Sequence, residues 1–207
     1  MSPLDFDQSL LASGLVKIGV PLDYQSSLLA YLVLLSKWNK VYNLTAITEP
    51  REMVIKHIFD SLAINQYLVG SRFIDVGSGA GIPGIILAIV NPKQTWYLLD
   101  SSQKRTYFLA EVKSSLNLDN LRIIHSRVEA YKPDIDFNGV VTRAFASLAK
   151  TINICNHLSP YLYAMKATIS KDDQTTLEQY KHSHFELMVP FLDQNRCLIK
   201  INQKADI

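Results

Sequence analysis

Four of the chain's eight glycines stand within eight consecutive residues, directly after a short apolar run and before a helix-forming segment. The apolar run is Arg72–Val76, and the predicted helix covers residues 82–90, with Pro83 in its first turn, where a missing N–H is tolerated. Glycines at such a junction allow positive φ and let a ligand touch the backbone, while the helix N-terminus offers free N–H groups. A tight turn without a ligand is the weaker explanation, because clustered glycines cost conformational entropy. The feature predicts a strand–loop–helix unit that binds a ligand.

The segments after this loop continue to alternate between strand and helix. Short apolar runs predict strands, and a helical pattern covers residues 103–116. The strands are expected at residues 96–99, 121–124 and 139–142. Such βαβ units with right-handed crossovers give a mostly parallel sheet with helices on both faces. Beyond residue 152 the pattern weakens, and late strands are expected at residues 185–189 and 197–201, the latter closing the sheet.

The first 70 residues show helical periodicity instead. Apolar residues at helical spacing predict a helix that ends at Gly19 and a second helix over residues 22–42. A third helix is expected from Glu49, with Thr48 as its N-cap. The sequence therefore predicts an α/β fold in which a helical extension, residues 1–70, precedes one compact ligand-binding core, residues 71–207.

The composition is typical of a globular enzyme. Apolar residues make up 48% and charged residues 19% of 207 positions, and a chain of this length needs no disulfide or metal to stabilise its core. The N-terminus has no basic leader and the apolar runs are too short to cross a bilayer, so we expect a cytoplasmic protein without membrane contact. Cys155 and Cys197 fit no ligand pattern, and no metal is expected. The net charge of +2 decides little, because polyanion binding depends on how charge is distributed.

The glycine loop leaves two kinds of ligand open. Three of its glycines satisfy the dinucleotide pattern G-x-G-x-x-G, and Asp100, at the end of the next strand, suits a ribose in either kind of site. Asp75 and Gly77 extend the pattern to D-x-G-x-G-x-G, which resembles the first motif of class I methyltransferases. An acid there would repel a pyrophosphate. S-adenosylmethionine is therefore the preferred ligand, with predicted contacts at Asp75, Gly77, Gly79 and Asp100.

In this fold the methyl acceptor enters beside the loop after the fourth strand, residues 142–147. Methylation of an exocyclic amine usually uses an Asn/Asp-Pro-Pro-aromatic turn, which the sequence lacks. Methylation of pyrimidine C5 needs a cysteine nucleophile near this loop, and neither cysteine is expected there. An acceptor with an exposed lone pair remains, and guanine N7 is the leading candidate. Arg143 offers a planar guanidinium suited to positioning a phosphate or a guanine edge, and the loop contains no general base.

Basic residues near the same edge predict contacts with RNA. Lys104 and Arg105 open a predicted helix, where cations oppose the helix dipole, so a phosphate contact explains them better than stability does. A second basic group surrounds the helical extension, and its members suit a solvated face equally well: Lys37, Lys40, Arg51, Lys56 and His57.

Short blocks of sequence spread over residues 28–149 add a more specific pattern. They are LTAIT at 44–48, HIFDSL at 57–62, DVGSGAGIPG at 75–84, LLDS at 98–101 with Lys104 and Arg105, SRVE at 126–129 and RAFASL at 143–148. Together these blocks resemble the ribosomal RNA small-subunit methyltransferase G family, also called the glucose-inhibited division protein B family.

The resemblance implies a class I, Rossmann-like methyltransferase that uses S-adenosylmethionine to modify guanine N7 in the decoding region of 16S ribosomal RNA. Its substrate would be the small ribosomal subunit or an assembly intermediate. By position, the family's cofactor contacts fall on Gly77, Ile82, Val128, Glu129 and Arg143. RNA contacts are expected at Lys104, Arg105, Arg127, Arg143 and Lys166. The family's Pro-Gly-Gly turn and Leu-Lys-Gly end are missing, since no glycine follows Gly139.

Two other functions stay open at this point. An NAD-type oxidoreductase would need a catalytic histidine or a Tyr-x-x-x-Lys pair, and no such pair occurs between residues 67 and 171. A non-catalytic RNA-binding factor for ribosome assembly would keep the same fold without the chemistry.

Overall fold

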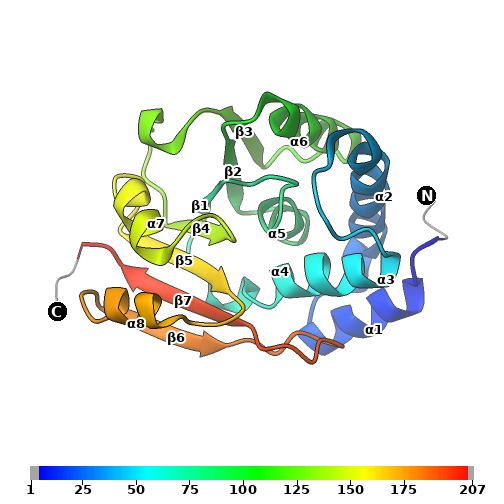
Figure 1. The fold of residues 1–207 in the computed structure, drawn as a ribbon. Helices are drawn as coiled ribbons and strands as arrows, with labels where there is room; N and C mark the ends of the chain where they lie inside the picture. The colour runs from blue at the N-terminus through cyan, green and yellow to red at the C-terminus, as the bar shows by residue number, and fades with distance from the viewer. Residues whose placement is uncertain (1–4, 205–207) are drawn as a thin grey trace.

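A computed structural model describes residues 5–204, which form a seven-stranded sheet with helices on both faces (Figure 1). The strand order is β3-β2-β1-β4-β5-β7-β6. Strands β1 to β5 pair in parallel, and β7 runs antiparallel to both of its neighbours. The strands are β1 (Arg72–Val76), β2 (Thr95–Asp100), β3 (Leu121–His125), β4 (Gly139–Arg143), β5 (Tyr161–Lys166), β6 (His182–Glu186) and β7 (Cys197–Asn202). The predicted mostly parallel α/β sheet is confirmed.

Helices fill the N-terminal part and then alternate with the strands. They are α1 (Gln8–Ile18), α2 (Gln25–Tyr42), α3 (Pro50–Met53), α4 (Asp60–Leu62), α5 (Gly84–Val90), α6 (Gln103–Ser115), α7 (Leu148–Cys155) and α8 (Lys171–Leu177). A π-helical segment, Val54–Phe59, joins α3 to α4, and short 3₁₀ turns cover Leu22–Tyr24, Asn65–Tyr67 and Val128–Ala130. None of the helices formed by residues 5–204 has both the length and the apolar character needed to cross a bilayer.

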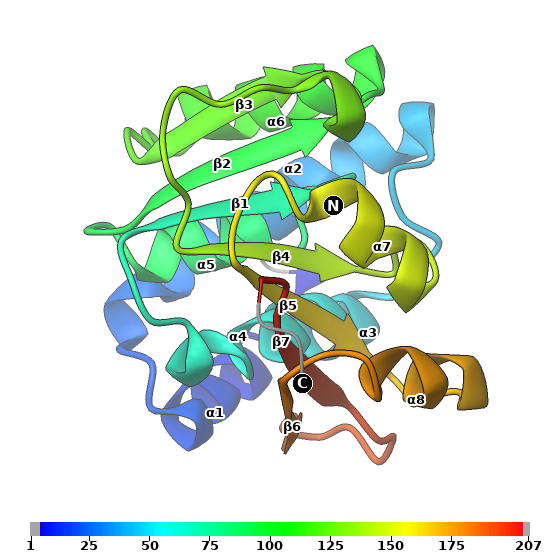
Figure 2. The ribbon, with the colours of Figure 1, turned by 90° about the vertical axis from the view of Figure 1, so that its left-hand side faces the viewer.

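The sheet separates two buried clusters of side chains. Figure 2 shows α7 in front of the sheet, with α5 and α2 behind it. On the α5 side, Phe73 and Trp96 pack with apolar side chains of α1 and α2, so the N-terminal helices and the sheet share one core. On the α7 side, Ile74 and Val76 pack with residues of α7 and α8. Alternating residues of β1 therefore face opposite layers, as expected for a strand buried on both faces.

Two predicted helix starts differ from the observed ones. Thr48 is not the cap of α3; the carboxylate of Glu49 accepts hydrogen bonds from the backbone N–H groups of Arg51, at 3.1 Å, and Glu52, at 2.7 Å. The predicted helix over residues 82–90 begins at Gly84, with Pro83 as its N-cap. At α3 the neighbouring Glu49 thus caps the first turn, whereas Pro83 makes no side-chain cap and the N–H of Gly84 is bound by Asp75.

The C-terminal third contains elements that the sequence pattern did not predict. Strand β5, which pairs with β4 and β7, was missed, as were α7 and α8. The predicted strand over residues 185–189 instead ends at Glu186 and begins at His182. Strand β7 confirms the prediction of a strand at 197–201, although β6, and not β7, forms the edge of the sheet.

Candidate active site

Side chains able to bind ligands gather at the carboxyl edge of the sheet, where the strand order reverses between β1 and β4. In open α/β sheets ligands bind in the crevice at this reversal. The parallel strands end there at Val76, Asp100, His125, Arg143 and Lys166. The edge therefore collects one carboxylate and several basic groups beside the glycine loop.

The glycine loop after β1 uses backbone conformations that favour glycine. Gly77 has φ of 71° and Gly79 has φ of 56°. A Cβ on Gly77 would overlap the ring of Phe145, whereas a Cβ on Gly79 would enter open space, with the carbonyl of Gly77 as its nearest neighbour at 3.8 Å. The N–H of Gly79 donates to Oδ2 of Asp100 at 2.9 Å. The loop thus lies flat against the end of β2 and leaves space above Gly79.

Asp75 lies beneath the loop and is buried. Its Oδ2 accepts a hydrogen bond from the N–H of Gly84 at 2.9 Å, at the start of α5. Its Oδ1 is buried without a hydrogen-bond partner among the described residues. Burial raises the pKa of Asp75 to about 7. The hydrogen bond from the Gly84 N–H lowers the pKa, and the negative charge of the nearby Asp100 raises it further. Asp75 therefore orders the loop from below.

One cavity opens beside the loop, with a volume of about 460 Å³. We call it the glycine-loop cavity. Its walls come from the ends of β1, β2 and β3 and from the loop after β4. They include Gly77, Asp100, Arg105, Arg127, Val128, Glu129, Ala144, Phe145, Ala146 and Lys150. Its volume lies within the range of about 300–1,000 Å³ that is typical of small-molecule sites.

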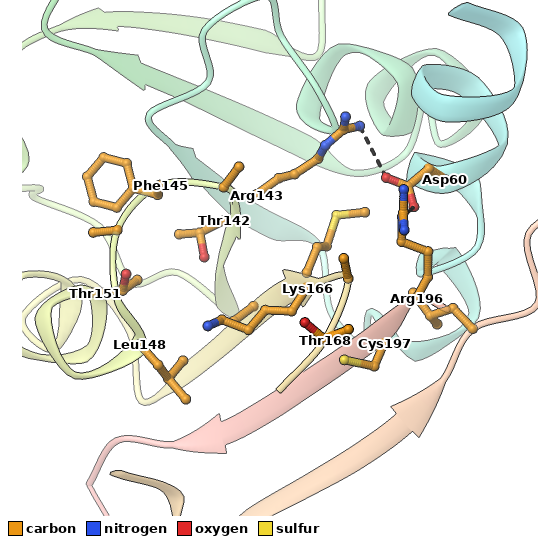
Figure 3. A pocket seen from close by; sticks show the side chains of 16 residues that line it. Asp60, Thr142, Arg143, Phe145, Leu148, Thr151, Lys166, Thr168, Arg196 and Cys197 are labelled. Carbon is orange, nitrogen blue, oxygen red and sulfur yellow. Dashed lines mark ion pairs between the residues drawn. The ribbon is translucent and has the colours of Figure 1, made fainter. Parts of the chain in front are cut away.

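A second cavity, of about 340 Å³, is lined by the same β4 loop (Figure 3). We call it the β4–β5 cavity. It shares Ala144, Phe145 and Ala146 with the first. The charged side chains that line it are Asp60, Arg143, Lys166 and Arg196. Three cations and one carboxylate make it suited to an anionic or hydrogen-bonding ligand.

The cations of this cavity are held by buried acids. Nη1 of Arg143 lies 3.2 Å from Oδ2 of Asp60 and donates to the carbonyl of Lys56 at 2.9 Å. Nε of Arg196 lies 3.2 Å from Oδ1 of the same aspartate. Lys166 pairs with Asp173 of α8 at 2.6 Å. Although burial raises the pKa of Asp173, hydrogen bonds from Lys166 and Ser170 outweigh it and the pKa is lowered.

Comparison with known proteins agrees with this arrangement. A family model described as rRNA small subunit methyltransferase G matches residues 24–199. The chain belongs to this methyltransferase family. A ribosomal RNA small subunit methyltransferase G from Hydrogenovibrio crunogenus is 50% identical over 192 residues, covering 89% of each chain. A protein of the same name from Klebsiella pneumoniae (strain 342) is 47% identical over 189 residues, covering 88% of this chain and 91% of the relative.

Solved structures support the fold at lower similarity. A SAM-dependent methyltransferase from Aquifex aeolicus has a TM-score of 0.59 and 16% identity, covering 81% of this chain and 98% of that one. M. capricolum TrmK in complex with S-adenosyl-homocysteine has a TM-score of 0.55 and 17% identity, covering 72% of this chain and 71% of that one. The predicted class I, Rossmann-like methyltransferase fold and the resemblance to the methyltransferase G family are confirmed. Neither the oxidoreductase nor the non-catalytic alternative is favoured.

The predicted cofactor contacts of this family member fall into three groups. Gly77, Asp100, Val128 and Glu129 line the glycine-loop cavity together. Gly79 donates a hydrogen bond to Asp100 of that wall, whereas Asp75, at the end of β1, bonds to Gly84 and does not line the cavity. Ile82 is half-buried against the core formed with the N-terminal helices and is not among the described residues that line either cavity. Arg143 lines the β4–β5 cavity and points at Asp60. A cofactor role stays a prediction for all of these residues, and Ile82 and Arg143 lie outside the lining of the glycine-loop cavity.

The predicted RNA contacts also differ in their surroundings. Lys104 and Arg127 are exposed at the carboxyl edge. Nη1 of Arg105 lies 3.4 Å from Oδ2 of Asp100. This ion pair can also account for a positive charge at the start of α6, without a contact to an RNA phosphate. Lys166 is half-buried and bound to Asp173. RNA contact at all of these residues stays a prediction.

Two predictions from the sequence are wrong: that neither cysteine lies near the β4 loop, and that His57 belongs to a basic surface. Cys197 does lie near the β4 loop, because antiparallel pairing places it opposite Lys166 at the end of β5. Its thiol is buried, and burial raises its pKa, which disfavours the thiolate that a nucleophile requires. His57 is not part of a basic surface: it is buried, and burial, with Arg143 nearby, lowers its pKa to about 4.

Sequence reasoning assigned no role to Asp60, which lies between the two arginines of the β4–β5 cavity. The available signal was a single acid inside the apolar block HIFDSL, since a charge at such a position needs a partner. Within residues 5–204, no group of three or more His, Cys, Asp or Glu side chains is arranged to hold a metal ion.

Proposed function

We propose that this methyltransferase transfers a methyl group from S-adenosylmethionine to N7 of a guanine in 16S ribosomal RNA, within the small subunit or an assembly intermediate in the cytoplasm. Family membership supports an rRNA substrate. The observation that carries the proposal is the pair of cavities at the β4 loop, which share Ala144, Phe145 and Ala146. Methyl transfer requires donor and acceptor in two adjoining sites with one opening between them.

The glycine-loop cavity fits the cofactor on three observations. Gly79 presents backbone to open space, where a Cβ would intrude. Asp100 ends β2 with a buried carboxylate next to the loop, at the place where this kind of fold holds a ribose. Val128, in the 3₁₀ turn that follows β3, offers an apolar contact for a flat base, with Glu129 beside it. When bound, the cofactor supplies an electrophilic methyl group on a positively charged sulfur.

The residues of the β4–β5 cavity are proposed to bind and orient the acceptor. Arg143 and Arg196 present planar guanidinium groups that suit the O6 edge of guanine or a flanking phosphate. Lys166, paired with Asp173, adds a third cation at the end of β5. Lys104, Arg105 and Arg127 are proposed to contact phosphates outside the cavities. No step of the proposed reaction requires a side chain to remove a proton, because N7 carries none.

The test is methyl transfer from labelled cofactor to small subunits that lack the modification, followed by mapping of the modified nucleotide by mass spectrometry. We expect the label on a guanine of 16S RNA, with the mass of one methyl group added to the base at N7. Cofactor binding without label transfer to any RNA would support the non-catalytic alternative. Titration with NAD in place of S-adenosylmethionine should give no binding.

A further inference from the structure

The carboxylate of Asp60 joins three segments that are far apart in the sequence. Asp60 begins α4, Arg143 ends β4, and Arg196 directly precedes β7. One oxygen of the carboxylate lies 3.2 Å from Nη1 of Arg143, and the other lies 3.2 Å from Nε of Arg196. Figure 3 shows both arginine side chains converging on Asp60 at the wall of the β4–β5 cavity.

The exposure of the three side chains differs in a way that points to the cavity. Asp60 is 5% exposed, whereas Arg143 and Arg196 are 22% and 17% exposed. The acid is therefore enclosed, and its partners keep part of their surface open to the cavity that they line. A carboxylate removed from water costs free energy unless charged partners offset it, so the two arginines and the acid depend on one another.

The backbone around Asp60 adds a further constraint on Arg143. The π-helical segment Val54–Phe59 runs directly into α4, and the carbonyl of Lys56 accepts a hydrogen bond of 2.9 Å from Nη1 of Arg143, in addition to the ion pair of that group with Asp60. Short π-helical segments are rare and frequently occur at functional sites. One face of the N-terminal helical segment thus holds the guanidinium of Arg143 at two points.

We propose that Asp60 is a positioning residue that holds Arg143 and Arg196 at the angle at which they orient the methyl acceptor in the β4–β5 cavity. The inference rests on the proposed function, since it assigns the acceptor to this cavity. A planar guanidinium recognises its ligand through a fixed fork of donors, so its orientation matters as well as its charge. Asp60 also offsets one of the two charges beside a purine ring that becomes cationic on methylation.

The variant Asp60→Asn keeps the size of the side chain and removes its charge. We expect the single-turnover rate to fall about 10- to 100-fold, because misplaced positioning groups cost rate in this range. The cofactor Kd should stay within about twofold, since the glycine-loop cavity is lined by other residues. RNA affinity at low salt should hold or increase, because the cavity loses a negative charge and keeps both cations. A merely structural role would lower RNA binding, cofactor binding and rate together.

The matched control is Glu52→Gln, which breaks the exposed ion pair of Glu52 with Lys56 at 2.8 Å in the same helical stretch. It should leave rate and both affinities unchanged. A double-mutant cycle adds a second measurement: Asp60→Asn should reduce the rate less in an Arg196→Gln background than in the parent chain, since only the pairing with Arg143 is left to lose. Additive effects, or a parental rate in Asp60→Asn, would overturn the assignment.

If Asp60→Asn does not fold, Arg196→Lys decides, since lysine keeps the charge and loses the planar fork. It should fold and lose rate at unchanged cofactor affinity, and a parental rate would overturn the proposal. The proposed function is judged separately by the parent chain: if the parent methylates no guanine N7 in small subunits, that function is wrong. If the parent is active and the variants match it, only the role of Asp60 is wrong.

Discussion

The hydroxyl of Tyr31, on α2, donates a hydrogen bond of 2.9 Å to the backbone carbonyl of Ala80 inside the glycine loop. The side chain of Tyr31 is fully buried, and burial raises its pKa, so the hydroxyl stays protonated as a donor. Helix α2 therefore contacts the glycine loop directly, across 49 residues of sequence. This bond gives the helical extension a part in shaping the loop.

Replacing Tyr31 by Phe should lower the free energy of unfolding by about 1–3 kcal/mol, because the buried carbonyl of Ala80 loses its donor. Cofactor affinity should fall as well, since the loop that carries Gly79 is no longer held. Urea unfolding and calorimetric titration with S-adenosylmethionine measure the two effects. Tyr107→Phe is the control, as Tyr107 is 59% exposed on α6. Equal effects of the two substitutions would show that the buried bond contributes nothing.

Replacing Gly79 by Val should abolish cofactor binding while the fold persists, because the new side chain would enter the open space above the loop. Positive φ alone costs about 1–2 kcal/mol for a residue with a Cβ. Gly19→Val separates the two effects: Gly19 has φ of 77°, nothing within 4 Å of its Cβ, and lies at the end of α1. Both variants should lose similar stability, and only Gly79→Val should lose the cofactor. If Gly79→Val still binds the cofactor, Gly79 does not contact it.

The sequence predicted well those elements whose apolar residues follow a simple period and whose ends are marked by turn-forming residues. β1, β2, β3 and β4 follow from short apolar runs bounded by loops, and the glycine loop marks the ligand edge. β5 was missed because Leu162 to Met165 are all buried, so the run has no two-residue alternation to separate it from a core helix. In contrast, α8 carried a readable signal, the Ser170–Asp173 capping box, which was overlooked.

The candidate site divides in the same way. Contacts within one loop or between adjacent strand ends, such as Gly79 with Asp100, follow from motif spacing and sheet order. The pairing of Asp60 with Arg143 and Arg196 does not, because it depends on how α4 and the segment before β7 pack around the edge. Cys197 is a similar case: only the antiparallel register of β5 and β7 brings it to the cavity.

Replacing Lys104 by Gln should weaken RNA binding and reduce the slope of log K against log salt by about one, the value for one phosphate contact. Lys104 is exposed at the start of α6, next to the glycine-loop cavity. Cofactor affinity should not change. Lys93→Gln is the control, since Lys93 is exposed before β2, at the opposite edge of the sheet. An unchanged salt slope in Lys104→Gln would mean that Lys104 is a solvent-exposed residue that contacts no phosphate.

The buried carboxyl of Asp75 should make stability depend on pH. Because its pKa is raised to about 7 when folded, from 3.8 in the unfolded reference, the folded chain binds the proton more tightly. This contribution is full below the unfolded value and is lost as pH rises through about 7. Asp75→Asn, which cannot titrate, should therefore gain stability relative to the parent as pH rises from about 4 to about 7. Asp173→Asn is the control: its lowered pKa predicts no such change in this window, and equal behaviour of both would contradict the assignment.

The methyl-transfer step itself should be nearly independent of pH. Guanine N7 has an in-plane lone pair and no proton, so the new bond forms without a proton acceptor. The only carboxylate among the described residues that line the β4–β5 cavity is Asp60, and both of its oxygens are paired with arginines. Burial raises the pKa of Asp60, and Arg143 and Arg196 oppose this. Burial raises the pKa of the Cys197 thiol in the same wall, which keeps it protonated. Catalysis then depends on alignment and on exclusion of water.

The measurement is the single-turnover rate at saturating RNA and cofactor, which should be flat across roughly pH 6.5 to 9. Saturation is essential, because ionisation of Asp75 near pH 7 would otherwise enter through cofactor affinity. A rise of about tenfold that follows one ionisation, with RNA binding unchanged, would mean that a base takes part and that N7 is the wrong acceptor. If that rise lay at the alkaline end and disappeared in Cys197→Ala, the thiolate would be the nucleophile and the acceptor a pyrimidine carbon. A flat profile in both the parent chain and Cys197→Ala leaves the lone pair of N7 as the attacking group.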